Sequence, residues 1–217
     1  MNLAVECALN GAYFSTGQRC TASSRLIVDE EIHDQFVDNL VQKLEQLKIG
    51  NALDETSQMG PVASKTQLNQ NLNYLKIGNE EGANEIIKGR AIELATPGYY
   101  MSPSLFVETD NSMRINREEV FGPVATILKV SGLEEALSVA NDTKFGLSAG
   151  ICTSSLKSAT KFKKEIQAGM VMINLPTAGV DYHVPFGGSK HSNMGSREQG
   201  KYAADFYTTI KTTYIGA

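Results

Sequence analysis

The sequence has few of the residues from which metal centres and disulfide frameworks are built. It contains three cysteines, Cys7, Cys20 and Cys152, and three histidines among 217 residues. An odd number of widely spaced cysteines disfavours a disulfide framework, and it also disfavours a clustered zinc site. So few histidines give poor support to a histidine-rich metal site. We therefore expect no bound metal and no structural disulfide.

Long apolar runs and a surplus of basic residues are also lacking. No run approaches the roughly 20 apolar residues that span a bilayer. The first residues have neither the basic flank nor the apolar stretch of a secretory signal. Lys and Arg number 20 against 24 Asp and Glu, whereas proteins that bind a phosphate backbone normally carry a basic surplus. These absences predict a cytoplasmic protein that has neither a membrane nor a nucleic acid as its partner.

The pattern that is present is an alternation of strands and helices. Residues 25–28 and 124–130 are typical of short buried strands, and a helix that opens at Asp29 is expected to bury Phe36 and Leu40. Another helix is predicted to begin at Ser64. Further strands are predicted at 85–89, 105–107, 149–152 and 169–174, and further helices at 133–141 and 155–166. This order predicts an α/β fold, a three-layer sandwich in which helices flank a mainly parallel sheet.

The last segment differs from the rest. Residues 206–215 (FYTTIKTTYI) are rich in residues that favour strands. A strand at the end of a chain needs a sheet to pair with, within the same domain or on another chain. The segment is therefore expected to form a terminal strand.

Cys20 is the first candidate for chemistry. It follows a turn that contains a glycine and stands beside Arg19, whose positive charge favours the reactive thiolate. The alternative interpretation is a small buried apolar residue, which is the usual role of a free cysteine. That interpretation is favoured for Cys7, on a helix face, and for Cys152, in the core of a strand.

Glu118 and Glu119 form a second candidate site. Two adjacent acids could transfer protons or hold ribose hydroxyls, but neighbouring residues on an extended chain point in opposite directions, so one site is not expected to use both. Taken alone, the pair is more typical of a solvated turn. The glycine turn at 185–190 (PFGGSK) does not match a phosphate-binding loop, and the chain has no Gly-x-Gly-x-x-Gly fingerprint.

Taken together and in this order, the motifs resemble those of the aldehyde dehydrogenase superfamily. They are residues 14–20 (FSTGQRC), 118–124 (EEVFGPV), 141–147 (NDTKFGL), and the pair 185–190 (PFGGSK) and 197–200 (REQG). The stretch 174–185 (NLPTAGVDYHVP) is most similar to the α-ketoglutaric semialdehyde dehydrogenase branch.

The resemblance implies a role for individual residues. Cys20 occupies the position of the family's nucleophile, which attacks the aldehyde. Its backbone N–H is expected to form part of the oxyanion hole. Glu119 stands where a carboxylate holds the nicotinamide ribose of NAD or NADP, and Phe121 where an aromatic side chain packs nearby. The aldehyde pocket is expected to be lined by Phe14, Arg19, Thr21, Thr177 and Phe186.

The resemblance also implies a domain organisation. Residues 1–205 correspond to the catalytic domain, and 206–217 to a C-terminal oligomerisation strand that pairs with a neighbouring subunit in a dimer or larger homo-oligomer. The family's cofactor-binding domain, which supplies the general base and an asparagine of the oxyanion hole, has no counterpart in the sequence. Cofactor binding by this chain alone is therefore not expected.

Two hypotheses follow from the resemblance. The chain is either the catalytic portion of an NAD(P)-dependent enzyme that oxidises a small aldehyde, such as α-ketoglutaric semialdehyde, to its acid, or a non-catalytic truncated product that acts only as a folded oligomerising module.

Overall fold

A four-stranded sheet forms the centre of the protein in the computed structural model, which describes residues 1–217. Its strands, in spatial order, are β1 (Arg25–Asp29), β6 (Val124–Val130), β5 (Ser104–Val107) and β2 (Asn84–Ile87). β1 and β5 both run parallel to β6, and β2 pairs antiparallel with β5 at one edge. The observed sheet is thus mainly parallel, as the sequence predicts, and it has one antiparallel edge strand.

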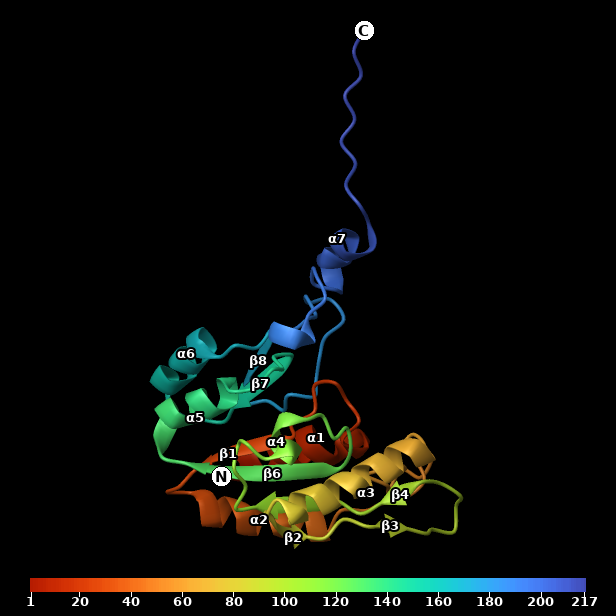
Figure 1. Cartoon of the computed structure of the whole chain (residues 1–217), viewed down its shortest axis with the longest axis vertical. Coiled ribbons are helices and arrows are strands. Elements are labelled where there is room, and N and C mark those ends of the chain that lie inside the picture. The colour runs from red at the N-terminus through yellow and green to blue at the C-terminus, as the bar shows by residue number, and fades with distance from the viewer.

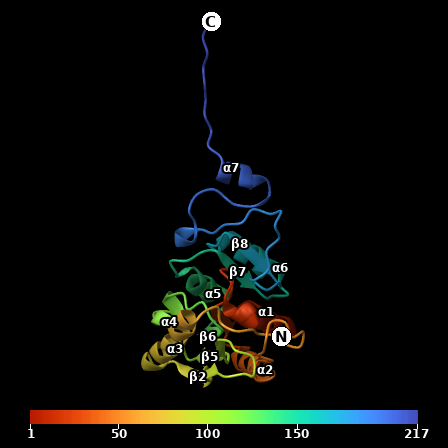
Figure 2. The same ribbon diagram turned by 90° about the vertical axis from the view of Figure 1, so that its right-hand side faces the viewer.

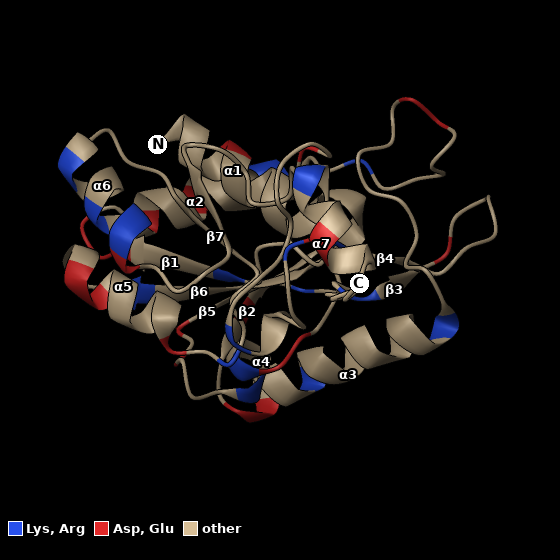
Figure 3. Ribbon diagram, turned by 90° about the horizontal axis from the view of Figure 1, so that it is seen from above, with Lys and Arg blue, Asp and Glu red and all other residues tan.

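Helices cover both faces of this sheet (Figure 3). The helices are α1 (Asn2–Tyr13) and α2 (His33–Glu45) on one face, and α3 (Lys65–Glu80) and α4 (Arg114–Arg117) on the other. Successive strand residues point to opposite faces. Leu105 and Val107 of β5 accordingly pack with α1 and α2, whereas Phe106 packs with α3. The layers are therefore helix, sheet and helix.

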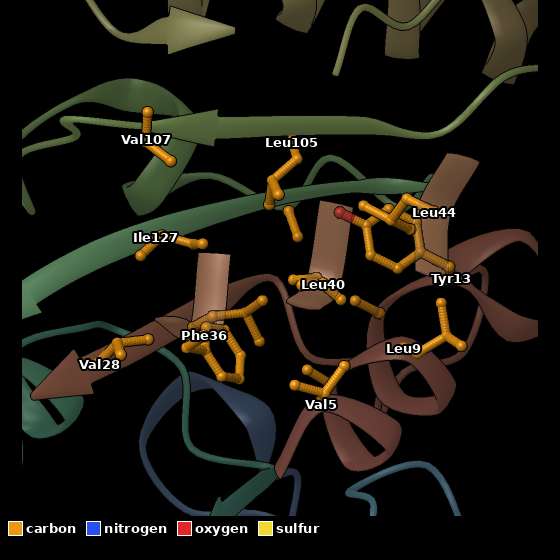
Figure 4. Close-up of a cluster of buried hydrophobic side chains, with 14 of the residues drawn as sticks. Val5, Leu9, Tyr13, Val28, Phe36, Leu40, Leu44, Leu105, Val107 and Ile127 are labelled. Carbon is orange, nitrogen blue, oxygen red and sulfur yellow. The ribbon is translucent and has the colours of Figure 1, made fainter. Parts of the chain in front are cut away.

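The larger core lies between α1, α2 and the sheet (Figure 4). Phe36, Leu40 and Leu44 recur at helical spacing along α2 and are at most 5% exposed. They meet Val5 and Leu9 of α1 and the strand side chains. Full burial of an apolar side chain of this size contributes about 1.5–3 kcal/mol. This stripe therefore holds α2 against the sheet.

A second, smaller unit follows the central sheet. It contains the parallel pair β7 (Ser148–Ile151) and β8 (Met170–Ile173) with α6 (Leu156–Glu165), and α5 (Gly132–Asn141) joins it to the central sheet by packing against β1. The basic side chain of Lys161 on α6 pairs with Glu134 on α5, and Figure 3 shows these oppositely charged helices side by side. β7 and β8 do not join the four-stranded sheet. None of the helices is long and apolar enough to cross a bilayer.

The remaining elements are short. They are the 3-10 turns η1 (Phe14–Gly17), η2 (Lys190–Ser192) and η3 (Gly200–Tyr202), the strands β3 (Ala91–Ile92) and β4 (Tyr100–Met101), and the helix α7 (Ala203–Tyr207).

Two of the expected elements differ in the structure. The helix expected from Asp29 begins at His33, because Asp29 is the last residue of β1 and its carboxylate accepts a hydrogen bond from the Glu31 N–H at 3.0 Å, which makes a turn. Within this single chain, residues 206–215 form no strand, and their pairing with a neighbouring subunit stays a prediction. Phe206 and Tyr207 end α7, and the exposed residues 208–217 extend away from the rest of the chain and pair with no strand of it (Figures 1 and 2).

Candidate active site

The loop that carries Cys20 begins where α1 ends. Ser15, Thr16 and Gly17 have φ angles of 55°, 59° and 64°, a left-handed conformation that is uncommon outside glycine. The Thr16 hydroxyl donates to the Gly60 carbonyl at 3.1 Å. A hydrogen bond to a distant part of the chain therefore stabilises the turn. Cys20, which follows the turn, is exposed at the surface. The Cys20 N–H donates to no acceptor within the chain, so it is free to donate to a ligand.

The residues beside Cys20 are tied to two other parts of the fold. The Arg19 guanidinium donates to Ser15 Oγ at 2.9 Å and to Asn10 Oδ1 at 3.3 Å, so it lies back along the end of α1. Thr21 is buried, and its carbonyl accepts a hydrogen bond from Ser148 of β7 at 3.4 Å. Phe14, by contrast, is half-buried and packs against the larger core.

The Cys20 loop touches the loop that carries Glu119. A Cβ atom placed on Gly17 would overlap the Gly122 carbonyl oxygen. The two backbones therefore approach as closely as glycine allows. Phe121, in the second loop, has a φ of 57° and is half-buried. The structure thus brings together the two motifs that the sequence separates by about a hundred residues.

Glu118 and Glu119 have different environments. Glu118 forms an ion pair with Arg114 at 3.0 Å and accepts a hydrogen bond from the Tyr74 hydroxyl at 2.8 Å. The hydrogen bond from Arg114, followed by that from Tyr74, lowers the pKa of Glu118. The neighbouring Glu119 is exposed. Glu118 is therefore engaged by partners within the chain, whereas Glu119 is exposed to solvent.

Two residues of α3 that the sequence did not single out support the Glu119 loop. Gln67 Nε2 donates to the carbonyls of Val120 at 3.0 Å and Phe121 at 3.1 Å. Asn71 is fully buried, and its amide fills the space that a Cβ on Gly122 would need. The sequence carries one signal for Asn71, because it lies on the same helix face as Leu68 and Leu75. A polar side chain at a buried position needs specific hydrogen-bond partners, which suggests a structural role.

The two remaining pocket candidates have different neighbours. Thr177 is buried, and its hydroxyl lies 2.8 Å from the hydroxyl of Ser23, so it is joined to the segment that follows Cys20. Phe186 is half-buried and forms a backbone bridge with Glu198, with N to O distances of 2.7 and 2.9 Å. The surface hollows along α6 and between α1 and α2 include none of the predicted site residues.

The structure revises the interpretation of Cys152. It lies just beyond β7 and is an exposed residue, not part of a strand core. No group of three or more potential ligands that could hold a metal ion is present.

Comparisons with known proteins identify the family of the chain. The model of the aldehyde dehydrogenase family matches residues 1–213. The chain is 46% identical to α-ketoglutaric semialdehyde dehydrogenase of Bacillus subtilis, over 99% of this chain and 44% of that protein. It is 43% identical to α-ketoglutarate semialdehyde dehydrogenase of Haloferax volcanii, over 97% and 44%.

A solved structure of an aldehyde dehydrogenase also matches the chain. Betaine aldehyde dehydrogenase from Staphylococcus aureus, in complex with NAD+, superposes with a TM-score of 0.91 at 35% identity, over 95% of this chain and 41% of that one. The chain therefore spans less than half the length of these relatives. Because the family model covers almost every residue, the chain belongs to the aldehyde dehydrogenase family.

Proposed function

We propose that this chain is the catalytic portion of an NAD(P)-dependent aldehyde dehydrogenase, with Cys20 as its nucleophile. The observation that carries the proposal is the contact between Gly17 and Gly122, which sets the Cys20 loop against the Glu119 loop. An enzyme of this kind needs its nucleophile and its hydride acceptor at one place.

Cys20 has the surroundings that a nucleophile needs. It is exposed at the end of a turn held by Thr16. Attack of its sulfur on the aldehyde carbon forms a thiohemiacetal, whose oxygen carries the developing negative charge. The free Cys20 N–H is available to donate to that oxygen. Water then releases the acid from the thioester that remains after the hydride has left.

Glu119 and Phe121 fit a nicotinamide ribose. The exposed Glu119 carboxylate can accept hydrogen bonds from two ribose hydroxyls, and the half-buried Phe121 gives an apolar surface beside it. Bound NAD(P) supplies the hydride acceptor. The chain's own part is to position the ribose. Gln67 and Asn71 keep the loop in place for that task.

The semialdehyde substrate is suggested by the two relatives at 46% and 43% identity, whose names specify α-ketoglutaric or α-ketoglutarate semialdehyde. We propose the same substrate for this chain, with Phe14, Arg19, Thr21, Thr177 and Phe186 as pocket residues. The general base and the adenosine site are proposed to come from the part of the relatives that this chain does not match.

A fusion experiment tests the proposal. The unmatched N-terminal part of the Bacillus subtilis relative is placed before residue 1, and NADH formation from α-ketoglutaric semialdehyde is followed under reducing conditions. The fusion should form NADH, while the 217-residue chain alone should not. Cys20→Ala should abolish the signal and the matched control Cys152→Ala should keep it. Full activity in the Cys20→Ala fusion would contradict the assignment of Cys20 as the nucleophile, and a folded fusion that forms no NADH would favour the non-catalytic oligomerising module.

A further inference from the structure

Three cationic side chains from distant segments meet at the C-terminal end of α5. The last carbonyl groups of a helix have no partner within the helix, and the helix dipole favours cations near them. Here Arg25, at the start of β1, donates to the carbonyls of Val139 at 2.9 Å and Ala140 at 3.1 Å. The end of α5 is thereby attached to the strand that follows the Cys20 loop.

The second cation is Arg117, which ends α4 and precedes Glu119 by two residues. Its guanidinium donates to the Asp142 carbonyl at 2.6 Å and lies 2.9 Å from the Asp142 carboxylate. Asn111 donates to the same carboxylate at 2.8 Å, which keeps the acceptor in place. The start of the Glu119 loop is therefore attached to the residue that caps α5.

The third cation is Lys190, which follows Phe186 by four residues. Its ammonium group donates to the Asn141 carbonyl at 2.6 Å and to the Thr143 carbonyl at 3.2 Å. An ammonium group has three N–H donors, so most of its hydrogen-bonding capacity is used here. The segment that carries Phe186 is therefore attached to the same turn as the Glu119 loop.

The backbone around Lys190 reinforces this attachment. Lys190 has a φ of 54°, a left-handed conformation that is uncommon outside glycine. Such a conformation persists only where the surrounding contacts fix it. On one side the Ser189 N–H donates to the Gly146 carbonyl at 2.8 Å, and on the other the His191 N–H donates to the Lys144 carbonyl at 3.0 Å. Main chain and side chain thus hold Lys190 together.

We propose that Arg117 and Lys190 are positioning residues, which hold the Glu119 loop and the Phe186 segment in place by binding the end of α5. The inference rests on the proposed roles of Glu119 in holding the ribose and of Phe186 in lining the aldehyde pocket. Because each cation holds a different segment, loss of one should disturb the binding of one ligand and spare the other. A cation that only stabilised α5 would have no such selectivity.

Steady-state kinetics of the fusion enzyme test this selectivity. Arg117→Met and Lys190→Met remove the charged group and keep an unbranched side chain. Lys190→Met should raise KM for α-ketoglutaric semialdehyde by about fivefold, the effect of one lost hydrogen bond, and leave KM for NAD within about twofold. Arg117→Met should do the reverse. A purely structural role would reduce the amount of folded enzyme, which lowers kcat and leaves both KM values unchanged.

Two exposed cations provide matched controls. Arg90 directly precedes β3, and the Lys201 ammonium lies over the ring of its own neighbour Tyr202, 5.5 Å from the ring centroid. Arg90→Met and Lys201→Met should leave both KM values unchanged. Arg117→Lys, which keeps the charge, should recover part of the loss seen in Arg117→Met.

Hydrogen exchange of the 217-residue chain gives a measurement that needs no activity. Arg117→Met should speed amide exchange in residues 118–124 by about tenfold and spare residues 185–192, and Lys190→Met should do the converse. If the parent fusion forms no NADH, the proposed function fails, while the exchange rates still decide whether the two cations hold their segments. The positioning role is overturned if both variants raise the same KM, if they lower kcat alone, or if exchange in the two segments is unchanged.

Discussion

Gly17 is the residue at which the proposed nucleophile loop touches the proposed ribose-binding loop. Its φ of 64° is unfavourable for other residues. An added Cβ would overlap the Gly122 oxygen and would lie 2.8 Å from the Ala12 oxygen. Gly17 is thus required for two separate reasons, backbone conformation and space.

A pair of substitutions separates these two reasons. Gly82 also has a positive φ, of 90°, but nothing lies within 4 Å of its added Cβ. Gly82→Ala should lower the free energy of unfolding by about 1–2 kcal/mol, from backbone strain alone. Gly17→Ala should lower it by at least about 1 kcal/mol more, from the overlap between the two loops. Urea denaturation measures both, and equal losses would show that the loops are not in contact.

The sequence could identify the residues that act but not those that support them. Cys20 and Glu119 lie in short local motifs, and the divergence of Glu118 and Glu119 follows from their adjacency. Gln67 could not be assigned to the Glu119 loop in the same way, because it is 53 residues from the Val120 carbonyl that it contacts. The close approach of the two loops is likewise a product of the fold, not of any local pattern.

Among the elements, α1 connects the core to the Cys20 loop through its last residue. The Tyr13 side chain is fully buried, and its hydroxyl donates to the Ser104 carbonyl of β5 at 3.0 Å. Burial raises the pKa of Tyr13 well above its usual value. The folded chain therefore keeps this phenol protonated at a pH where the unfolded chain loses the proton.

This difference makes stability depend on pH. Above about pH 10 the unfolded state binds fewer protons, so the free energy of unfolding falls, by up to about 1.4 kcal/mol for each pH unit. Tyr13→Phe should lower stability by about 1 kcal/mol at neutral pH, through loss of the hydrogen bond, and should make the decline above pH 10 shallower. The control is Tyr182→Phe, since Tyr182 is 86% exposed. Parallel profiles for the original chain and Tyr13→Phe, recorded by urea denaturation across pH, would contradict this account.

Elements with a strong local signal were predicted best. β1 and β6 are runs of apolar residues, and α3 begins after Ser64, whose hydroxyl accepts a hydrogen bond from the Gln67 N–H at 3.1 Å. The segment 206–215 has equally clear strand propensity, yet it forms no strand within this chain. A strand exists only where another strand accepts its hydrogen bonds, and the residue pattern does not say where that partner is.

At the scale of the whole molecule, the extended tail is the feature without a partner in the chain (Figure 2). Ile210 is 96% exposed and Ile215 is 92% exposed. An exposed segment of this composition is suited to adding a strand to the sheet of another copy. We expect the chain to form a dimer or larger homo-oligomer through it.

Light scattering tests this expectation. Deleting residues 208–217 should lower the measured mass toward that of a monomer. Ile210→Pro should act in the same direction, because proline cannot donate a backbone hydrogen bond, whereas Ile210→Val should not. A monomer at high micromolar concentration, or an unchanged mass after the deletion, would show that the tail does not hold copies together.

The central claim is that Cys20 is the nucleophile of this fold, and acylation by an ester measures it most directly. p-Nitrophenyl acetate transfers its acetyl group to a reactive thiol and releases nitrophenolate, with no need for a cofactor. The 217-residue chain should release nitrophenolate slowly and carry the acetyl group on tryptic peptide 20–25, and Cys20→Ala should lose both. An acetyl group found first on peptide 1–19 or 145–157, or an unchanged release rate in Cys20→Ala, would contradict the account.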